Sequence, residues 1–109
     1  MELKSTLRSA LALTLCAVLT ACASGRGHQN FKNIMQLEVG KSADAPYAYR
    51  NHYRERRIAS RTLPNGNIEE EYRSGRGPHC RVYFEIDEAA GKIVNWRYEG
   101  TEQDCVIVP

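Results

Sequence analysis

The sequence predicts a small α+β domain, in which one or two short N-terminal helices pack on an antiparallel meander of about four strands. Apolar residues recur at helical spacing in the first part of this domain and alternate with polar residues in the second part. Glycine-containing turns separate the alternating segments. A chain of 109 residues has room for one domain at most.

The first residues of the chain have the pattern of a secretory signal peptide. Lys4 and Arg8 precede an apolar run at positions 10–19 that only Thr14 interrupts. Signal peptides typically have such a basic start before an apolar stretch of about 7–15 residues. The run is shorter than the roughly 20 residues of a membrane-spanning helix, and it lacks the polar face of a core helix. We therefore expect residues 1–21 to be removed from the mature protein.

The end of this segment carries its most specific motif. Leu19-Thr20-Ala21-Cys22 follows the apolar run and resembles the lipobox of bacterial lipoproteins. The resemblance implies cleavage between Ala21 and Cys22, followed by lipid attachment to the sulfur and the new amine of Cys22. The next residue is Ala23 and not an aspartate, which resembles lipoproteins sorted to the outer membrane. The expected location is therefore the cell envelope, with the domain anchored in the outer membrane and facing the periplasm.

A flexible tether is expected after the lipidated cysteine. Residues 22–29 are mostly small and polar, a composition typical of linkers. The folded domain is therefore expected to occupy residues 30–109, about 80 residues with a correspondingly small core.

Two short helices are expected at the start of this domain. Asn30 is suited to cap the first, whose apolar residues at helical spacing are Phe31, Ile34, Met35 and Leu37. The second helix is expected after Ser42, because Asp44 can act as its N-cap and Pro46 then falls in its first turn. Tyr49 and Tyr53, four residues apart, would share one side of it.

The rest of the domain has the pattern of an antiparallel meander. Strands are expected at residues 58–63 and 68–73, joined at Asn65-Gly66, because this dipeptide favours tight hairpins. Two further strands are expected on either side of a turn at residues 87–91. Their core-facing residues, which alternate with polar ones, are Cys80, Val82, Phe84 and Ile86 on the first strand and Val94, Trp96 and Tyr98 on the second.

The four cysteines divide between three roles. Cys16 lies in the signal peptide and Cys22 carries the lipid, which leaves Cys80 and Cys105 to form a disulfide in an oxidising compartment. A metal site that combines them with a histidine lacks the closely spaced cysteine pair typical of zinc. A redox role lacks the C-x-x-C spacing. The disulfide is expected to tie the C-terminus to the domain.

The arrangement of these elements resembles the small SmpA/OmlA-type (BamE-like) outer-membrane lipoproteins. The shared features are the lipobox, a helical start around residues 37–42, and a strand run over residues 91–100 that includes Trp96 and Tyr98. The Gly-x-Pro that this family commonly has after its second helix is absent from the sequence. The resemblance implies an α+β fold and an outer-membrane location.

Charge and residue type identify a candidate contact surface. The chain has 15 basic and 13 acidic residues, a balance that does not favour nucleic-acid binding. The most conspicuous basic stretch consists of Arg50, Arg54, Arg56, Arg57 and Arg61. Arginine suits anions and lipid headgroups. The favoured interpretation is nevertheless a solvated face balanced by Glu55 and by Glu69-Glu70-Glu71 on the neighbouring strand.

The sequence contains no recognisable catalytic constellation. His28, His52 and His79 stand apart from one another and from any nucleophile pattern. No metal is expected, and no cofactor beyond the lipid on Cys22. The favoured hypothesis is a non-enzymatic binding or assembly module that contacts the membrane through its lipid and an outer-membrane or periplasmic protein through its domain. The alternatives are a structural or stress-related lipoprotein without a specific partner, and a small hydrolase.

Overall fold

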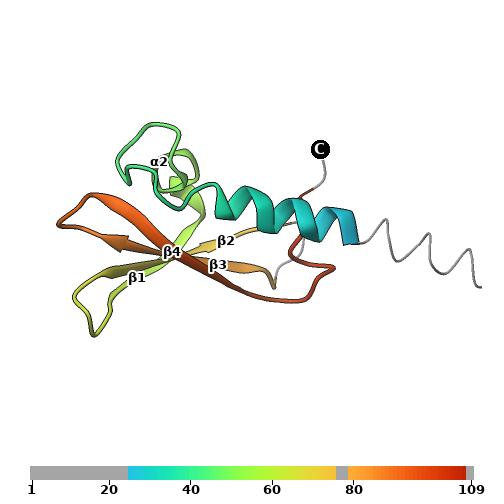
Figure 1. The fold of residues 1–109 in the computed structure, drawn as a ribbon. Helices are drawn as coiled ribbons and strands as arrows, with labels where there is room; N and C mark the ends of the chain where they lie inside the picture. Colours follow the sequence, from blue (N-terminus) through green and yellow to red (C-terminus); the bar gives the residue numbers. More distant parts are fainter. Residues whose placement is uncertain (1–24, 76–78, 108–109) are drawn as a thin grey trace, which may run out of the picture.

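The computed structural model describes residues 25–75 and 79–107. A helix over residues 25–36 packs with a four-stranded antiparallel sheet (Figure 1). Along the chain, the helix is followed by two short helical turns before the first strand: α2 (Tyr49–His52) and η1 (Arg54–Arg56). The expected signal peptide, the lipobox and Cys22 lie outside the described residues. Within the described part, no helix has the length and hydrophobicity needed to cross a membrane.

The sheet is the meander that the alternating pattern predicts. Its strands are β1 (Arg57–Thr62), β2 (Ile68–Arg73), β3 (Arg81–Asp87) and β4 (Lys92–Glu99), and each pairs antiparallel with the next in the order β1-β2-β3-β4. The β1–β2 connection occurs at the predicted turn. It is wider than a two-residue hairpin, because the Leu63 amide bonds the Asn67 carbonyl at 2.7 Å and positive φ occurs at Gly66 but not at Asn65.

The helix begins earlier than the sequence predicts. Residues 25–29 are helical and not a flexible tether, and His28 is buried. The His28 ring bonds the Cys105 carbonyl through Nδ1 at 2.8 Å, and the Gly27 carbonyl accepts the Ile107 amide at 3.0 Å. The domain boundary at residue 30 is therefore wrong, because contacts with the C-terminal segment fix the preceding turn of helix.

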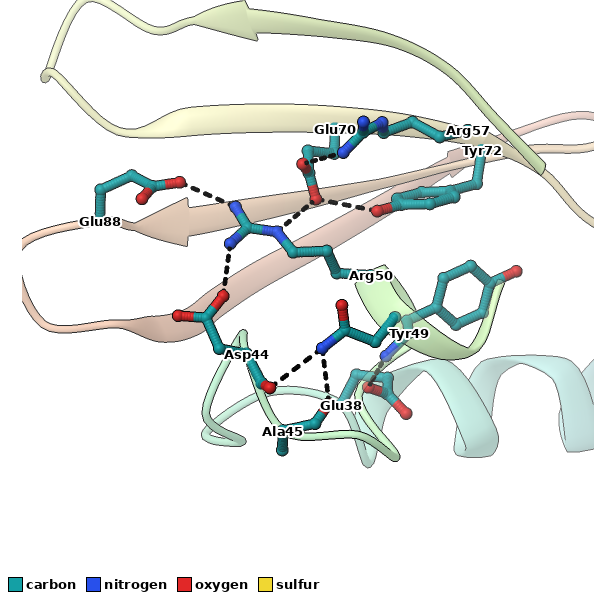
Figure 2. A network of polar contacts seen from close by, with 10 residues as sticks. Glu38, Asp44, Ala45, Tyr49, Arg50, Arg57, Glu70, Tyr72 and Glu88 are labelled. Atoms are coloured by element: carbon teal, nitrogen blue, oxygen red, sulfur yellow. Dashed lines mark hydrogen bonds and ion pairs between the residues drawn. The ribbon is translucent and has the colours of Figure 1, made fainter. Parts of the chain in front are cut away.

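The second predicted helix is shorter than expected and starts later. Residues 43–48 form turns and bends, and α2 covers only Tyr49–His52 with Ala48 at its N-cap position. Asp44 and Pro46 therefore do not open the helix. Instead, the Glu38 carboxylate accepts the Tyr49 amide at 3.0 Å and takes the place of a local cap (Figure 2). The expected proximity of Tyr49 and Tyr53 is confirmed, since their ring centroids lie 4.6 Å apart.

The core lies between the helix and one face of the sheet. Its largest fully buried side chains include Phe31 and Met35 from the helix and Tyr72, Phe84 and Ile86 from the sheet. The predicted alternation is confirmed for its core-facing residues, all of which are buried: Cys80 directly before β3, and Val82, Phe84 and Ile86 on β3.

On β4 the predicted alternation fails at one residue. A register shift between Glu85 and Ile86 pairs Ile93 with Ile86 and leaves Val94 as the extra residue. Ile93 is buried as a result, and Val94 is 42% exposed. Trp96 and Tyr98 pack against the core as predicted.

The predicted disulfide is present. Cys80 and Cys105, 25 residues apart in the sequence, are bonded with their Cα atoms at 5.2 Å. The bridge joins the C-terminal segment to the start of β3. Because His28 and Gly27 also bond this segment, the bridge holds together the N-terminal end of the helix, the start of β3 and the C-terminus.

Candidate functional site

Three of the five predicted contact arginines are held in ion pairs. Arg50 bonds Glu70 and Asp44 at 3.1 Å and Glu88 at 2.8 Å, as Figure 2 shows. Arg57 bonds the second Glu70 oxygen at 3.1 Å. The acidic run on β2 therefore balances these arginines, as the sequence predicts. The contact is not a solvated one, however, because Glu70 is buried.

Arg61 is the third of these arginines, and it belongs to the opposite face of the sheet. Its guanidinium lies 2.8 Å from the buried carboxylate of Glu69, which Arg97 also bonds at 2.9 Å. Arg97 in turn stacks 3.7 Å above the ring of Tyr83, which explains why Tyr83 is buried although the sequence predicts an outward position. The hydrogen bond from Arg97 is the main reason why the pKa of Glu69 lies below its ordinary value. This face is an ion-paired surface.

Arg54 and Arg56 differ from the other three. Both lie in η1 and are exposed, and neither forms an ion pair with any residue in the described parts of the chain. Arg56 lies over the ring of Tyr53, 5.3 Å from its centroid. Three arginines of the basic stretch therefore form ion pairs within the domain. The charges of Arg54 and Arg56 have no ion-pair partner among the described residues and remain available to a ligand.

Arg56 lines a groove that the sequence does not predict. The groove has a volume of about 450 Å³ and lies between the helix, the α2–η1 segment, the loop after β2 and the C-terminal segment. Its walls combine apolar and polar side chains: Ile34, Met35, Glu38, Tyr47, Tyr49, His52, Tyr53, Arg56, Ser74, Gly75, Val106 and Ile107. Its size falls within the range of small-molecule and peptide pockets, about 300–1,000 Å³.

The inner part of the groove is closely packed. Tyr49 is buried and its ring packs 4.8 Å from Phe84 and 5.0 Å from Tyr72. Its hydroxyl donates to Ser74 Oγ at 3.4 Å, and burial raises the pKa of the Tyr49 phenol above its ordinary value. Tyr49 is therefore a neutral, fixed aromatic group at physiological pH.

Glu38 is the acidic residue of the groove, and its charge is compensated. One carboxylate oxygen accepts the Tyr49 amide at 3.0 Å and the other bonds Lys41 Nζ at 2.8 Å. Lys41 also lies 5.6 Å from the ring centroid of Tyr47. The buried carboxylate therefore holds α2 against the helix and leaves little net negative charge in the groove.

The rim of the groove combines exposed apolar side chains with the cationic side chain of Arg56. Ile34 is 40% exposed and Tyr47 is 68% exposed, both large apolar side chains at the surface of a small domain. The ring of His52 meets the edge of Tyr53 with 4.6 Å between centroids, next to Arg56. The sequence predicts a shared apolar side for Phe31, Ile34, Met35 and Leu37, but the structure buries Phe31 and Met35 and leaves Ile34 and Leu37 exposed.

The C-terminal wall of the groove depends on the disulfide and on a glycine. Val106 and Ile107 directly follow Cys105, so the bridge to Cys80 sets their position. Gly75 has φ +71°, and a Cβ atom at this position would overlap the Asp104 carbonyl oxygen. The loop after β2 and the C-terminal segment therefore approach each other as closely as a glycine allows.

Among the described residues, neither the metal site nor the catalytic thiol considered from the sequence is assembled. Cys80 and Cys105 are joined to each other, so neither is a free thiolate for a metal or for catalysis. His28 bonds Cys105 and Tyr98, and His52 packs on Tyr53. In residues 25–75 and 79–107, no group of three or more His, Cys, Asp or Glu side chains is placed to hold a metal ion.

Comparison with known proteins gives no relative. No family model matches the chain, no curated protein matches it, and no solved structure matches it.

Proposed function

We propose that this chain is a lipid-anchored envelope protein whose small domain binds another molecule in the groove beside the N-terminal helix. The observation that carries the proposal is the groove itself. It has a volume of about 450 Å³, and its lining includes the exposed side chains of Ile34, Tyr47 and Arg56. A rigid apolar recess with a few placed polar groups is the usual form of a binding site.

The anchor and the fold together support a position close to the membrane. Cys22, the proposed lipidation site, is three residues before residue 25, where the described helix begins. Three residues of extended chain reach about 10 Å at most. Two or more acyl chains on the cysteine would make the attachment lasting. The domain, including its groove, would therefore be held next to the membrane surface instead of at the end of a long tether.

The contacts inside the groove support binding without chemistry. Glu38 bonds Lys41 and the Tyr49 amide, while Ser74 accepts the Tyr49 hydroxyl. A general base or nucleophile needs to be within hydrogen-bond reach of a reacting group. Glu38 and Ser74 are instead engaged in hydrogen bonds within the domain, and His52 packs against Tyr53. We therefore favour a binding or assembly module over a small hydrolase.

A structural lipoprotein without a specific partner is the second candidate. The ion pairs of Arg50, Arg57 and Arg61 favour it, because they account for most of the basic stretch without any partner. This candidate leaves the exposed apolar rim unexplained, since Ile34 and Tyr47 would face water with no function.

Photocrosslinking in living cells tests the proposal. A photoreactive phenylalanine analogue would replace Tyr47 at the groove rim in the full chain, and in a control it would replace Asn65, an exposed loop residue away from the groove. We expect a discrete adduct from Tyr47 and none from Asn65. Equal labelling from both positions, or none from either, would contradict groove binding and favour the structural candidate.

A further inference from the structure

We infer that the groove takes a short peptide segment of a partner protein in which an apolar side chain lies next to carboxylates. This inference rests on the proposed function, because it names the chemistry of the occupant of the same groove. The apolar rim, the charges around it and the polar groups along the walls support it.

The apolar part of the occupant follows from the exposed rim. Ile34 and Tyr47 stand on two different segments and both line the groove, with Met35 buried beside Ile34. An apolar or aromatic side chain that packs against both would remove their surfaces from water, which favours binding. Large side chains that fill such recesses usually dominate peptide and protein binding.

The acidic part follows from charge complementarity. Arg56 lines the groove, and Arg54 stands two residues before it. Neither has an ion-pair partner among the described residues, in contrast to Arg50 and Arg57 in the same stretch. Arginine binds carboxylates through paired hydrogen bonds, so an acidic residue beside the apolar one would meet the Arg56 guanidinium.

The one acid of the groove does not oppose this arrangement. Glu38 is buried, and Lys41 bonds it at 2.8 Å while the Tyr49 amide bonds it at 3.0 Å. Its charge is therefore balanced before any ligand arrives, and the uncompensated charge at the rim is that of Arg56.

The polar groups of the walls favour a peptide over an acyl chain. Ser74, the Tyr49 hydroxyl and Glu38 line the groove between its apolar residues. Glu38 and Tyr49 are already bonded within the domain, but the guanidinium of Arg56 also lines the groove, and a hydrocarbon chain would cover it without offering a hydrogen bond, which is costly. A peptide backbone supplies a donor and an acceptor at each residue other than proline.

Binding of defined peptides to the lipidated full chain in zwitterionic nanodiscs tests the inference. The main probe is a fluorescent serine–glycine peptide that carries one phenylalanine between two glutamates, followed by anisotropy. Two matched peptides replace the phenylalanine by alanine or the glutamates by lysines. We expect each change to weaken binding about tenfold or more, and added salt to weaken binding of the main probe.

Protein variants locate the site. Arg56→Glu is expected to weaken binding of the main probe about tenfold or more, while Arg54→Glu, in the same helical turn but outside the groove lining, changes it much less. Both arginines are exposed, so neither variant is expected to unfold the domain. Equal effects of the two variants, or an alanine peptide that binds as tightly as the phenylalanine peptide, would overturn the inference.

A fluorescent fatty acid separates the two ligand classes. Binding of the fatty acid at the groove without binding of any peptide would overturn the peptide inference while groove binding stands. If no probe binds but Tyr47 still crosslinks in cells, the inference fails and the proposed function remains. If the main probe binds in an Arg56-dependent manner but Tyr47 yields no adduct, the proposed function in the cell fails while the chemistry of the groove stands.

Discussion

The hydroxyl of Tyr72 donates a hydrogen bond to the carboxylate of Glu70 at 2.8 Å, between two residues that share one face of β2. Glu70 is only 3% exposed, an unusual position for an acid. Arg50 and Arg57 each bond it at 3.1 Å (Figure 2). Burial, with the hydrogen bond to Glu70, raises the pKa of the Tyr72 phenol well above its ordinary value, although the two arginines act in the opposite direction. One carboxylate thus joins β1, β2 and α2.

The first prediction concerns this carboxylate. Glu70→Ala is expected to lower the free energy of unfolding by about 2–4 kcal/mol, because it leaves Arg50, Arg57 and Tyr72 without their shared acceptor. Glu88→Ala removes another partner of Arg50, but at an exposed site, and is expected to cost less than about 1 kcal/mol. Urea unfolding of both variants measures the difference. Similar costs for the two would show that the burial of Glu70 adds nothing.

The second prediction concerns pH and Glu69 on the other face of the sheet. The hydrogen bond from Arg97, with a further one from Arg61, lowers the pKa of Glu69 below its ordinary value of 4.5. Ionised Glu69 therefore stabilises the folded state above about pH 4.5, and this contribution is lost as the pH falls through the lower folded pKa.

Glu69→Gln provides the test. The variant is expected to be less stable than the wild type near neutral pH, and the difference should shrink as the pH falls below 4.5. Urea titrations over an acidic pH series give the two curves, with Glu102→Gln in the exposed loop after β4 as a control. Parallel curves for wild type and Glu69→Gln at all pH values would contradict the prediction.

The sheet and the disulfide were predictable because their signals are local or compositional. Alternation of apolar and polar residues at Val82, Phe84 and Ile86 determines which face of β3 is buried. The pairing of Cys80 with Cys105 follows once the other two cysteines are assigned. Neither inference requires knowledge of contacts between distant segments.

The remaining features depend on such contacts. Residues 25–29 have the composition of a linker, yet bonds from His28 and Gly27 to the C-terminal segment hold them in the helix. The bulge opposite Glu85 that turns Val94 outward has no recognised signal in the sequence. The groove joins four segments that are far apart along the chain, so its lining could not be read from any one of them.

The third prediction compares two glycines with positive φ. Gly66 has φ +88° and open space around its Cα, so Gly66→Ala is expected to cost only the backbone term, about 1–2 kcal/mol. Gly75→Ala has the same term and must also displace the Asp104 carbonyl, which adds about 1–3 kcal/mol. Thermal or urea unfolding compares the two variants. Equal losses would show that the loop and the C-terminal segment separate without cost.

The fourth prediction concerns the anchor. The protein extracted from membranes is expected to have an intact mass that lacks residues 1–21 and includes added acyl groups, as the lipobox resemblance implies. Cys22→Ser should remain unprocessed and carry no lipid. Cys16→Ser, in the predicted signal peptide, should give the wild-type mature mass. A full-length unmodified mass for the wild type would refute the anchor.

The last prediction links the disulfide to the groove. Replacement of both Cys80 and Cys105 by serine opens a loop with a sequence separation of 25 residues, which corresponds to a loss of about 3–4 kcal/mol in the free energy of unfolding. Domains of this kind have about 5–15 kcal/mol in total, so the variant should still fold. Urea unfolding measures the loss.

The same variant should also bind the phenylalanine–glutamate peptide more weakly than the wild type. Val106 and Ile107 form one wall of the groove, and without the bridge they are held near it mainly by the Ile107–Gly27 and His28–Cys105 hydrogen bonds. Loss of this wall removes apolar contact area from the bound peptide. Val106→Ala in the intact disulfide background isolates the packing contribution of one wall residue. A double-serine variant that is destabilised but binds the peptide with unchanged affinity would show that the C-terminal wall takes no part in binding, and would restrict the site to the helix and the α2–η1 segment.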